Sequence, residues 1–174
     1  MSYYDKVGTY YDKDAVEFEQ RYHENPALQR IRQSFRQHTK SYEQTTVLEV
    51  GFGPGFDLVH FAEQFPDRKF YGIDISAEMV RLTQEKIDRM GLKNAWVVKG
   101  SVEDIKVLFP EVQFDMIYVF FGALNTVNDL EGAFVDLRVV LSSGGRMVLT
   151  FVNKYYIAGT LIELLKLKPK FAFA

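Results

Sequence analysis

The stretch that decides the fold is Val47-Leu48-Glu49-Val50-Gly51-Phe52-Gly53-Pro54-Gly55. Its first four residues are β-branched or apolar apart from one acid, which predicts a buried parallel strand. The three glycines at alternate positions predict a tight turn with positive φ or close approach to a ligand. Helical spacing follows from Phe56 to Phe65. A strand, a glycine turn and a helix N-terminus together are typical of a nucleotide-like site in an open α/β sheet.

Strands and helices alternate after this stretch, joined by short turns. The alternation predicts a mostly parallel sheet with helices on both faces and right-handed crossovers. The expected strands are 46–50, 69–74, 95–99, 114–120 and 145–152, and the expected helices are 55–65, 76–90 and 129–141.

Two carboxylates restrict the class of ligand. A dinucleotide fingerprint needs glycine at position 56, where this chain has Phe56. Glu49 would repel a pyrophosphate but suits a ligand with an ammonium group; its alternative role is a strand carboxylate paired with Arg or Lys. Asp74 ends the second strand, 23 positions after Gly51. An acid there can accept hydrogen bonds from ribose hydroxyls and disfavours a 2′-phosphate; its alternative role is to cap the next helix.

Five segments resemble, in order and spacing, the motifs of the class I S-adenosylmethionine-dependent methyltransferases. The resemblance covers about residues 45 to 153 and implies a Rossmann-like α/β fold with S-adenosylmethionine as cofactor. The matching segments are Leu48–Gly55, Gly72–Ser76, Gly100–Asp104, Phe114–Tyr118 and Leu141–Arg146.

The resemblance also implies which residues contact the cofactor. The glycine turn would lie against the methionine moiety, Glu49 would bind its ammonium directly or through water, and Asp74 would bind the ribose. An apolar sandwich would hold the adenine, and an aromatic face would border the sulfonium. The implied cofactor-binding residues are Glu49, Gly51, Phe52, Gly53, Gly55, Asp74, Ile75, Met79, Ser101, Val102 and Phe120.

Three of these positions have alternative roles. Gly55 can serve helix packing, and Phe120 can belong to the core. Ser101 stands where many relatives have Asp, so its contact with the adenine would be weaker; Asp104 nearby is expected to be solvated or a cap, and Asp115 to be structural.

The acceptor side has fewer sequence signals. Asn125 follows the fourth strand and would orient an acceptor without deprotonating it. No residue is assigned as catalytic base, although His23 is a candidate on the N-terminal segment. Tyr10 and Tyr11 on the same segment are candidates for a lid over the cofactor, and His60 is expected at the surface or in the core.

Three parts of the chain are expected. Residues 1–44 would form an N-terminal helical lid segment, with a helix starting at Asn25-Pro26. Residues 45–153 would form the S-adenosylmethionine-binding α/β domain. Residues 154–174 would form a C-terminal helix and a truncated end. The family's last two strands are thus expected to be missing, because the chain is a fragment or a shortened member.

Composition predicts a small-molecule acceptor and a cytoplasmic setting. The 174 residues have a formal net charge of −2, which gives no electrostatic case for nucleic acid or an anionic membrane. There is no cysteine and no long apolar run, so disulfides, thiolate-metal sites and a membrane span are not expected. No metal site is predicted.

The leading hypothesis is therefore a methyltransferase that acts on a small molecule by in-line transfer. The first alternative is a module or fragment that binds S-adenosylmethionine without catalysis of its own. A nucleotide-dependent oxidoreductase is a weaker alternative, because Phe56 replaces the third fingerprint glycine.

Overall fold

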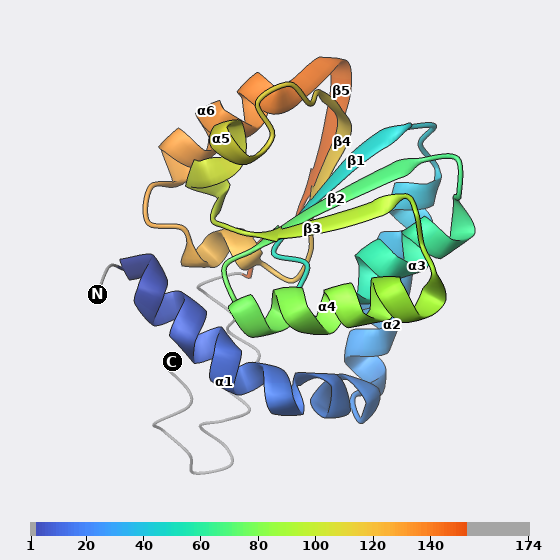
Figure 1. Ribbon diagram of the computed structural model, residues 1–174, viewed down its shortest axis with the longest axis vertical. Helices are drawn as coiled ribbons and strands as arrows, with labels where there is room; N and C mark the ends of the chain where they lie inside the picture. The colour runs from blue at the N-terminus through green and yellow to red at the C-terminus, as the bar shows by residue number, and fades with distance from the viewer. Residues whose placement is uncertain (1–2, 153–174) are drawn as a thin grey trace.

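The computed structural model describes residues 3–152, and within this range the predicted fold class is confirmed. Two helices precede a region in which strands and helices alternate (Figure 1). The elements are α1 (Tyr3–His23), α2 (Pro26–Lys40), β1 (Thr46–Val50), α3 (Phe56–Gln64), β2 (Lys69–Asp74), α4 (Ala77–Met90), β3 (Ala95–Lys99), η1 (Val102–Asp104), α5 (Ile105–Leu108), β4 (Phe114–Val119), η2 (Ala123–Thr126), α6 (Leu130–Val140) and β5 (Leu141–Leu149).

The described strands form one parallel sheet in the order β3-β2-β1-β4-β5. The order reverses at β1, where the chain crosses from one half of the sheet to the other. In open α/β sheets such a reversal creates a crevice beyond the carboxyl ends of the strands. The glycine turn after β1 lies at that position.

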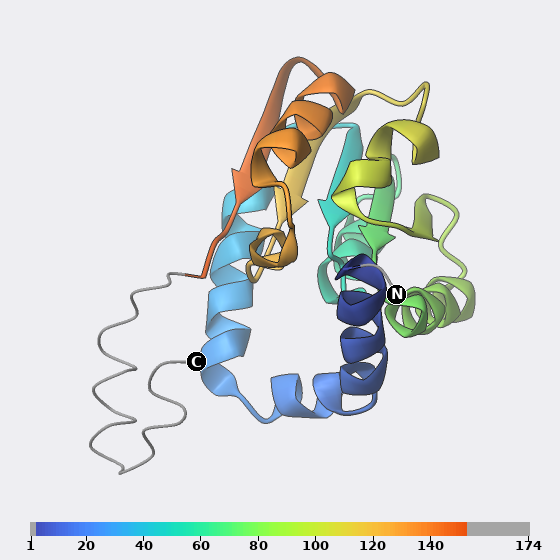
Figure 2. The same cartoon turned by 90° about the vertical axis from the view of Figure 1, so that its left-hand side faces the viewer.

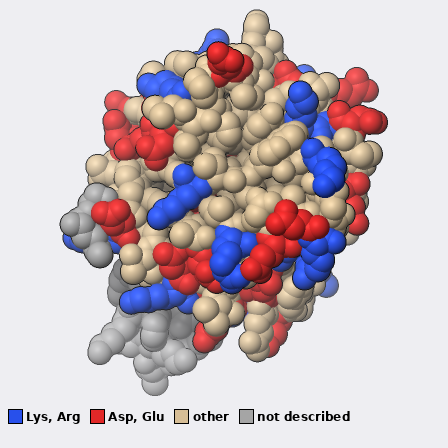
Figure 3. Space-filling view, viewed as in Figure 1, with Lys and Arg blue, Asp and Glu red and all other residues tan. Residues whose placement is uncertain are grey.

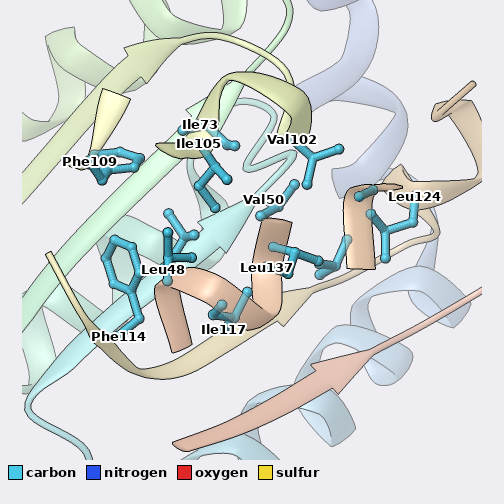
Figure 4. Close-up of a cluster of buried hydrophobic side chains, with 13 residues drawn as sticks. Leu48, Val50, Ile73, Val102, Ile105, Phe109, Phe114, Ile117, Leu124 and Leu137 are labelled. Carbon is cyan, nitrogen blue, oxygen red and sulfur yellow. The ribbon is translucent and has the colours of Figure 1, made fainter. Parts of the chain in front are cut away.

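Each face of the sheet is covered by its own apolar layer. Leu48, Phe114 and Ile117 point to one face and pack against α5 and α6, as Figure 4 shows. Val47 and Met116, one position away along the same strands, point to the other face and pack against α3 and α4. This alternation buries both sides of β1 and β4, which explains why their sequences are almost continuously apolar.

Helix α2 is held to the start of α3 by a buried ion cluster. Asp57, in the first turn of α3, has no exposed surface and pairs with Arg32 and Arg36 of α2; its distance to Arg36 Nε is 2.6 Å. Arg36 also donates to the Phe56 carbonyl at 2.5 Å. The guanidinium of Arg32 packs over three aromatic rings: Tyr22, Phe56 and Phe121.

Helix α1 begins at Tyr3, inside the expected N-terminal helical segment, and its buried residues Gly8 and Ala15 let it pack closely. The start of the last described strand differs from the sequence prediction. β5 begins at Leu141 rather than at Gly145, since Leu141 already pairs with Phe114. Residues 142–144, expected to connect a helix to this strand, lie inside β5 as a register irregularity, where Gly144 has φ of +78°. The expected helix at 154–174 lies outside the described residues, and the three-part division of the chain stays a prediction.

Replacing Asp57 with alanine should destabilise the fold by about 3–5 kcal/mol, because it leaves the buried Arg32 without a counter-charge. Urea unfolding would measure the change. Asp67→Ala, at an exposed turn, is the control and should change the unfolding free energy by less than about 0.5 kcal/mol. Equal losses in the two variants would show that the ion cluster does not hold α2 in place.

Candidate cofactor-binding site

A cavity of about 190 Å³ lies at the carboxyl ends of β1, β2 and β4. The strand ends supply one wall, η1 and η2 supply others, and α1 lies across the opening. Most of the lining is apolar or aromatic, with Asp74 as its buried carboxylate. The lining residues are Tyr4, Tyr11, Phe18, Val50, Gly51, Gly53, Ile73, Asp74, Ile75, Met79, Gly100, Ser101, Val102, Phe120, Phe121, Gly122, Ala123, Thr126 and Val127.

The glycine turn has the backbone that the sequence predicts. Gly51, Gly53 and Gly55 have φ of +71°, +55° and +76°, a region that side chains rarely tolerate. Gly51 and Gly53 line the cavity. Gly55 does not, and a Cβ there would lie 2.7 Å from Thr83 Oγ1 of α4, which fits the alternative packing role.

Asp74 binds the backbone of two loops at once. Its Oδ2 accepts from the Gly53 amide at 2.8 Å, and its Oδ1 accepts from the Ser76 amide at 2.9 Å. Burial raises the pKa of Asp74 to about 6, although these amides oppose the change. The residue that caps α4 is Ser76 rather than Asp74, because Ser76 Oγ accepts from the Met79 amide at 3.1 Å. Asp74 thus faces the cavity as a carboxylate with lone pairs still free.

Glu49 lies behind the turn rather than in the cavity lining. Its carboxylate is buried and accepts from the Tyr118 hydroxyl at 2.8 Å, so neither Arg nor Lys is its direct partner. Burial raises the pKa of Glu49 well above its ordinary value, and the nearby Asp57 adds to this. The Tyr118 hydroxyl, Arg32 and Arg36 oppose the rise. Phe52 is also outside the lining, with its ring packed in the core.

The remaining predicted residues come together around the cavity. Met79 and Val102 are almost fully buried, and Ile75 lies beside them in the lining. Ser101 lines the cavity too, but its hydroxyl donates to Asp104 Oδ2 at 2.8 Å. Phe120 is buried against Tyr118, with ring centroids 4.7 Å apart, so it belongs to both the core and the lining.

Helix α1 covers the cavity with Tyr11, which the sequence offered as a lid candidate, and with Tyr4 and Phe18, which sequence reasoning missed. Tyr4, Tyr11 and Phe18 recur at intervals of seven, which places them on one helical face. That spacing was the available signal. Tyr4 donates to Glu103 Oε1 at 2.5 Å and accepts from the Asn128 amide at 3.2 Å.

The same helix is fixed to the start of α4. Asp12 accepts from Ser76 Oγ at 2.6 Å and from the Glu78 amide at 3.1 Å. Gly8 lies so close to β2 that a Cβ there would be 3.0 Å from the Ile75 carbonyl oxygen. Figure 2 shows α1 and α2 joined at a corner, with α1 lying beside α4.

Other candidates lie away from the cavity. The His23 ring packs against Phe56, 5.8 Å between centroids, and Tyr10 is 65% exposed. Asn125 is not in the cavity lining; its side-chain amide exchanges two hydrogen bonds with the Val152 backbone, just after β5. Asp115 is structural, as expected: its Oδ2 accepts from both the backbone amide and the hydroxyl of Thr45.

The comparison with known families agrees with this geometry. Residues 41–172 match the family model described as a methyltransferase domain. The chain belongs to the class I S-adenosylmethionine-dependent methyltransferase family. The methyltransferase resemblance and the expected cofactor are thereby confirmed. The assignment of individual residues to cofactor atoms stays a prediction.

Individual relatives extend the comparison. The chain is 35% identical over 80 residues to the tRNA (guanine-N(7)-)-methyltransferase of Edwardsiella ictaluri, covering 45% of this chain and 34% of that protein. It is 31% identical over 137 residues to malonyl-[acyl-carrier protein] O-methyltransferase 1 of Ilyobacter polytropus, covering 75% and 49%. The structure of DhpI with SAH shares the fold, with TM-score 0.70, 20% identity and coverage of 87% and 70%.

These relatives correct one expectation from composition. Several of them are tRNA or rRNA methyltransferases, so the prediction that nucleic acid is not a partner is wrong. A net charge for the whole chain averages over its surface and does not reveal a local basic region.

The chain spans about half or less of the length of the curated relatives it matches. Among residues 3–152, no helix has the length and hydrophobicity that crossing a bilayer requires.

Gly51→Ala should lower the unfolding free energy by about 3 kcal/mol, since a positive φ costs about 1–2 kcal/mol and overpacking adds to it. A Cβ at Gly51 would lie 2.3 Å from Ala123 Cβ. Gly53→Ala is the matched control, because its φ is also positive but no atom lies within 4 Å of the added carbon. Chemical denaturation of both variants measures the difference. Equal destabilisation of the two variants would show that the close approach of η2 to Gly51 adds nothing to the loss of unfolding free energy.

Proposed function

We propose that this methyltransferase chain binds S-adenosylmethionine in the cavity beyond β1 and β2 and transfers its methyl group to a small-molecule acceptor. The observation that carries the proposal is the meeting of the glycine turn, Asp74 and an apolar lining at one edge of the sheet. The family match supports the same cofactor.

The residues present fit this cofactor. Asp74 uses one lone pair of each oxygen on backbone amides, which leaves acceptor capacity for two ribose hydroxyls. Ile75, Met79 and Val102 offer flat apolar contact for the adenine. The start of α3 follows the turn and favours the methionine carboxylate. Glu49 would act behind the turn through water, and a bound ammonium would lower its raised pKa.

The protein's contribution to the reaction is position and exclusion of water. When bound, the cofactor supplies an activated methyl group on a sulfonium. Phe120 and Phe121 border the cavity on the acceptor side, where aromatic faces stabilise positive charge. Tyr4, Tyr11 and Phe18 cover the cavity from α1 and keep it dry. Alignment of an acceptor for in-line attack in such a site lowers the barrier without a strong base.

A small acceptor is supported by the cover over the cavity. Helix α1 is attached at both η1 and α4, so it holds the rings of Tyr4, Tyr11 and Phe18 against a mostly apolar cavity. RNA guanine is the second candidate acceptor, favoured by the tRNA and rRNA methyltransferases among the relatives. A binding module without catalysis is the third candidate, because the chain spans only part of each curated relative's length.

Asp74→Ala should weaken S-adenosylhomocysteine binding by about 1.5–3 kcal/mol, because charged hydrogen bonds to the ribose are lost. Only the ionised carboxylate can accept both hydroxyls, and its pKa is about 6. Binding to the wild type should therefore weaken as pH falls, by about tenfold between pH 8 and pH 5. Calorimetry measures both effects.

Asp74→Asn should reduce the dependence on pH to the part that comes from Glu49, and Asp67→Ala should retain wild-type affinity. Binding of NADH but not of S-adenosylhomocysteine would contradict the cofactor assignment. An unchanged affinity in Asp74→Ala would contradict the ribose role.

The acceptor class can be read from where a labelled methyl group goes. The protein is incubated with methyl-labelled S-adenosylmethionine and a cell extract, and the extract is then separated by size before and after ribonuclease treatment. We expect label in the small-molecule fraction in both samples. Label that leaves the large fraction only after ribonuclease would establish RNA as acceptor instead. Binding of the cofactor without any transfer would support the module.

A further inference from the structure

Helix α2 differs in charge from the rest of the chain. It has fifteen residues, four of which are Lys or Arg, and it contains no Asp or Glu. Elsewhere the two signs are mixed: Figure 3 shows basic and acidic side chains intermingled over α1 and α4. There Arg81 pairs with Glu78, and Lys86 pairs with Glu19. The overall net charge of −2 does not reveal the positive charge of α2, because acidic residues in other elements outweigh it.

A second cavity, of about 340 Å³, lies along this helix. We call it the α2 cavity. Its lining is polar, with hydrogen-bond donors from α2 and α3 and no carboxylate. The lining residues are Tyr22, Gln29, Gln33, Arg36, Gln37, Lys40 and His60.

The charges that face the α2 cavity leave it positive. Arg36 and the adjacent Arg32 share a single counter-ion, Asp57. Within residues 3–152, Lys40 has no carboxylate within ion-pair distance. The attraction for an anion comes from these side chains and not from the helix dipole, because the carbonyl end of α2 lies at Lys40.

His60 adds a donor that has no partner. Its Nε2 is buried, and no hydrogen-bond partner lies near it. Burial, Arg36 and Lys40 lower the pKa of His60 to about 4, so the ring is neutral at pH 7. The same two cations would attract an anion. A buried polar atom without a partner is costly. His60 lines the α2 cavity, and a small shift of its ring would let Nε2–H donate to a ligand oxygen there and remove that cost.

The α2 cavity is separated from the cofactor cavity by stacked side chains. Arg32 lies with its guanidinium carbon 4.7 Å from the Tyr22 ring centre and 4.4 Å from that of Phe121. Tyr22 lines the α2 cavity, and Phe121 lines the cofactor cavity. One side of this stack therefore borders the cofactor cavity, and the other side borders the α2 cavity.

We propose that the α2 cavity binds a phosphate group, carried by the methyl acceptor at a distance from the methylated atom. Arg36 and Lys40 supply the charge, and Gln33, Gln37 and His60 supply neutral donors. The link to the acceptor rests on the proposed function; the phosphate site itself does not. The phosphate belongs either to a small phosphomonoester or to an RNA backbone.

Inorganic phosphate is the first probe, added to the 174-residue chain in a phosphate-free buffer of low ionic strength. Binding is followed by calorimetry and by the histidine imidazole signals in NMR. We expect the pKa of His60 to rise when phosphate binds, because a nearby anion favours the imidazolium. The His60→Gln variant lacks the imidazole signal of His60, so comparison with the wild-type spectrum shows which signal belongs to this residue. Lys40→Gln should weaken phosphate binding about tenfold through loss of a charged hydrogen bond.

Lys69→Gln is the matched control, since Lys69 is exposed at the start of β2 and does not line the α2 cavity. It should bind phosphate like the wild type. No binding by the wild type, or equal binding by the Lys40 and Lys69 variants, would overturn the proposal. S-adenosylhomocysteine binding is measured in the same samples and should be equal in all of them; its absence would refute the proposed function while leaving the phosphate result valid.

Two further ligands separate the sources of the phosphate. A nucleoside monophosphate and a short single-stranded RNA are each titrated against the wild type and Lys40→Gln. Loss of affinity in the variant for the monophosphate alone indicates a small acceptor, and loss for the RNA indicates a backbone phosphate. If the variant binds both ligands as tightly as the wild type does, the cavity does not hold the acceptor.

Discussion

The site depends on the position of one carboxylate, Asp74, at the end of β2. It accepts from a backbone amide of the glycine turn and from one at the start of α4. These two segments come from different crossovers of the sheet, and Asp74 holds them at a fixed separation. Its burial would disfavour the charge, and the two amides offset that cost in part. The carboxylate of Asp74 is therefore already positioned as a hydrogen-bond acceptor before any ligand binds in the cavity.

A second carboxylate, Asp57, likewise holds two segments together, in this case α2 and the start of α3. It is fully buried in the first turn of α3 and holds two arginines of α2. Through Arg32 this pair supports the rings of Tyr22, Phe56 and Phe121. Phe121 has a positive φ of 55°, so the surrounding contacts must hold a backbone conformation that phenylalanine disfavours. The position of Phe121 in the cavity lining thus depends on the Asp57–Arg32 ion pair, although Asp57 itself does not line the cavity.

Local patterns were enough to predict the sheet, the glycine turn and the position of Asp74, because each is encoded within a few residues. Asp57 and its arginines were not predicted, since helical spacing does not indicate which distant helix will pack against which. The start of β5 was predicted late because Gly144 and Gly145 are typical of a turn, whereas pairing with β4 continues past them. The exclusion of nucleic acid relied on the net charge of −2, which sums over the whole chain, and the tRNA and rRNA methyltransferases among the relatives overturned it.

The position of Tyr4 has a consequence for how the protein is made. Its hydroxyl bonds join residues 99 and 124 positions apart in the chain. During translation the first helix leaves the ribosome long before Glu103 and Asn128 exist, so it must wait without its docking surface. Closing loops of this length costs conformational entropy before the contacts form. The start of α1 can therefore complete its hydrogen bonds only after the chain has been made as far as Asn128.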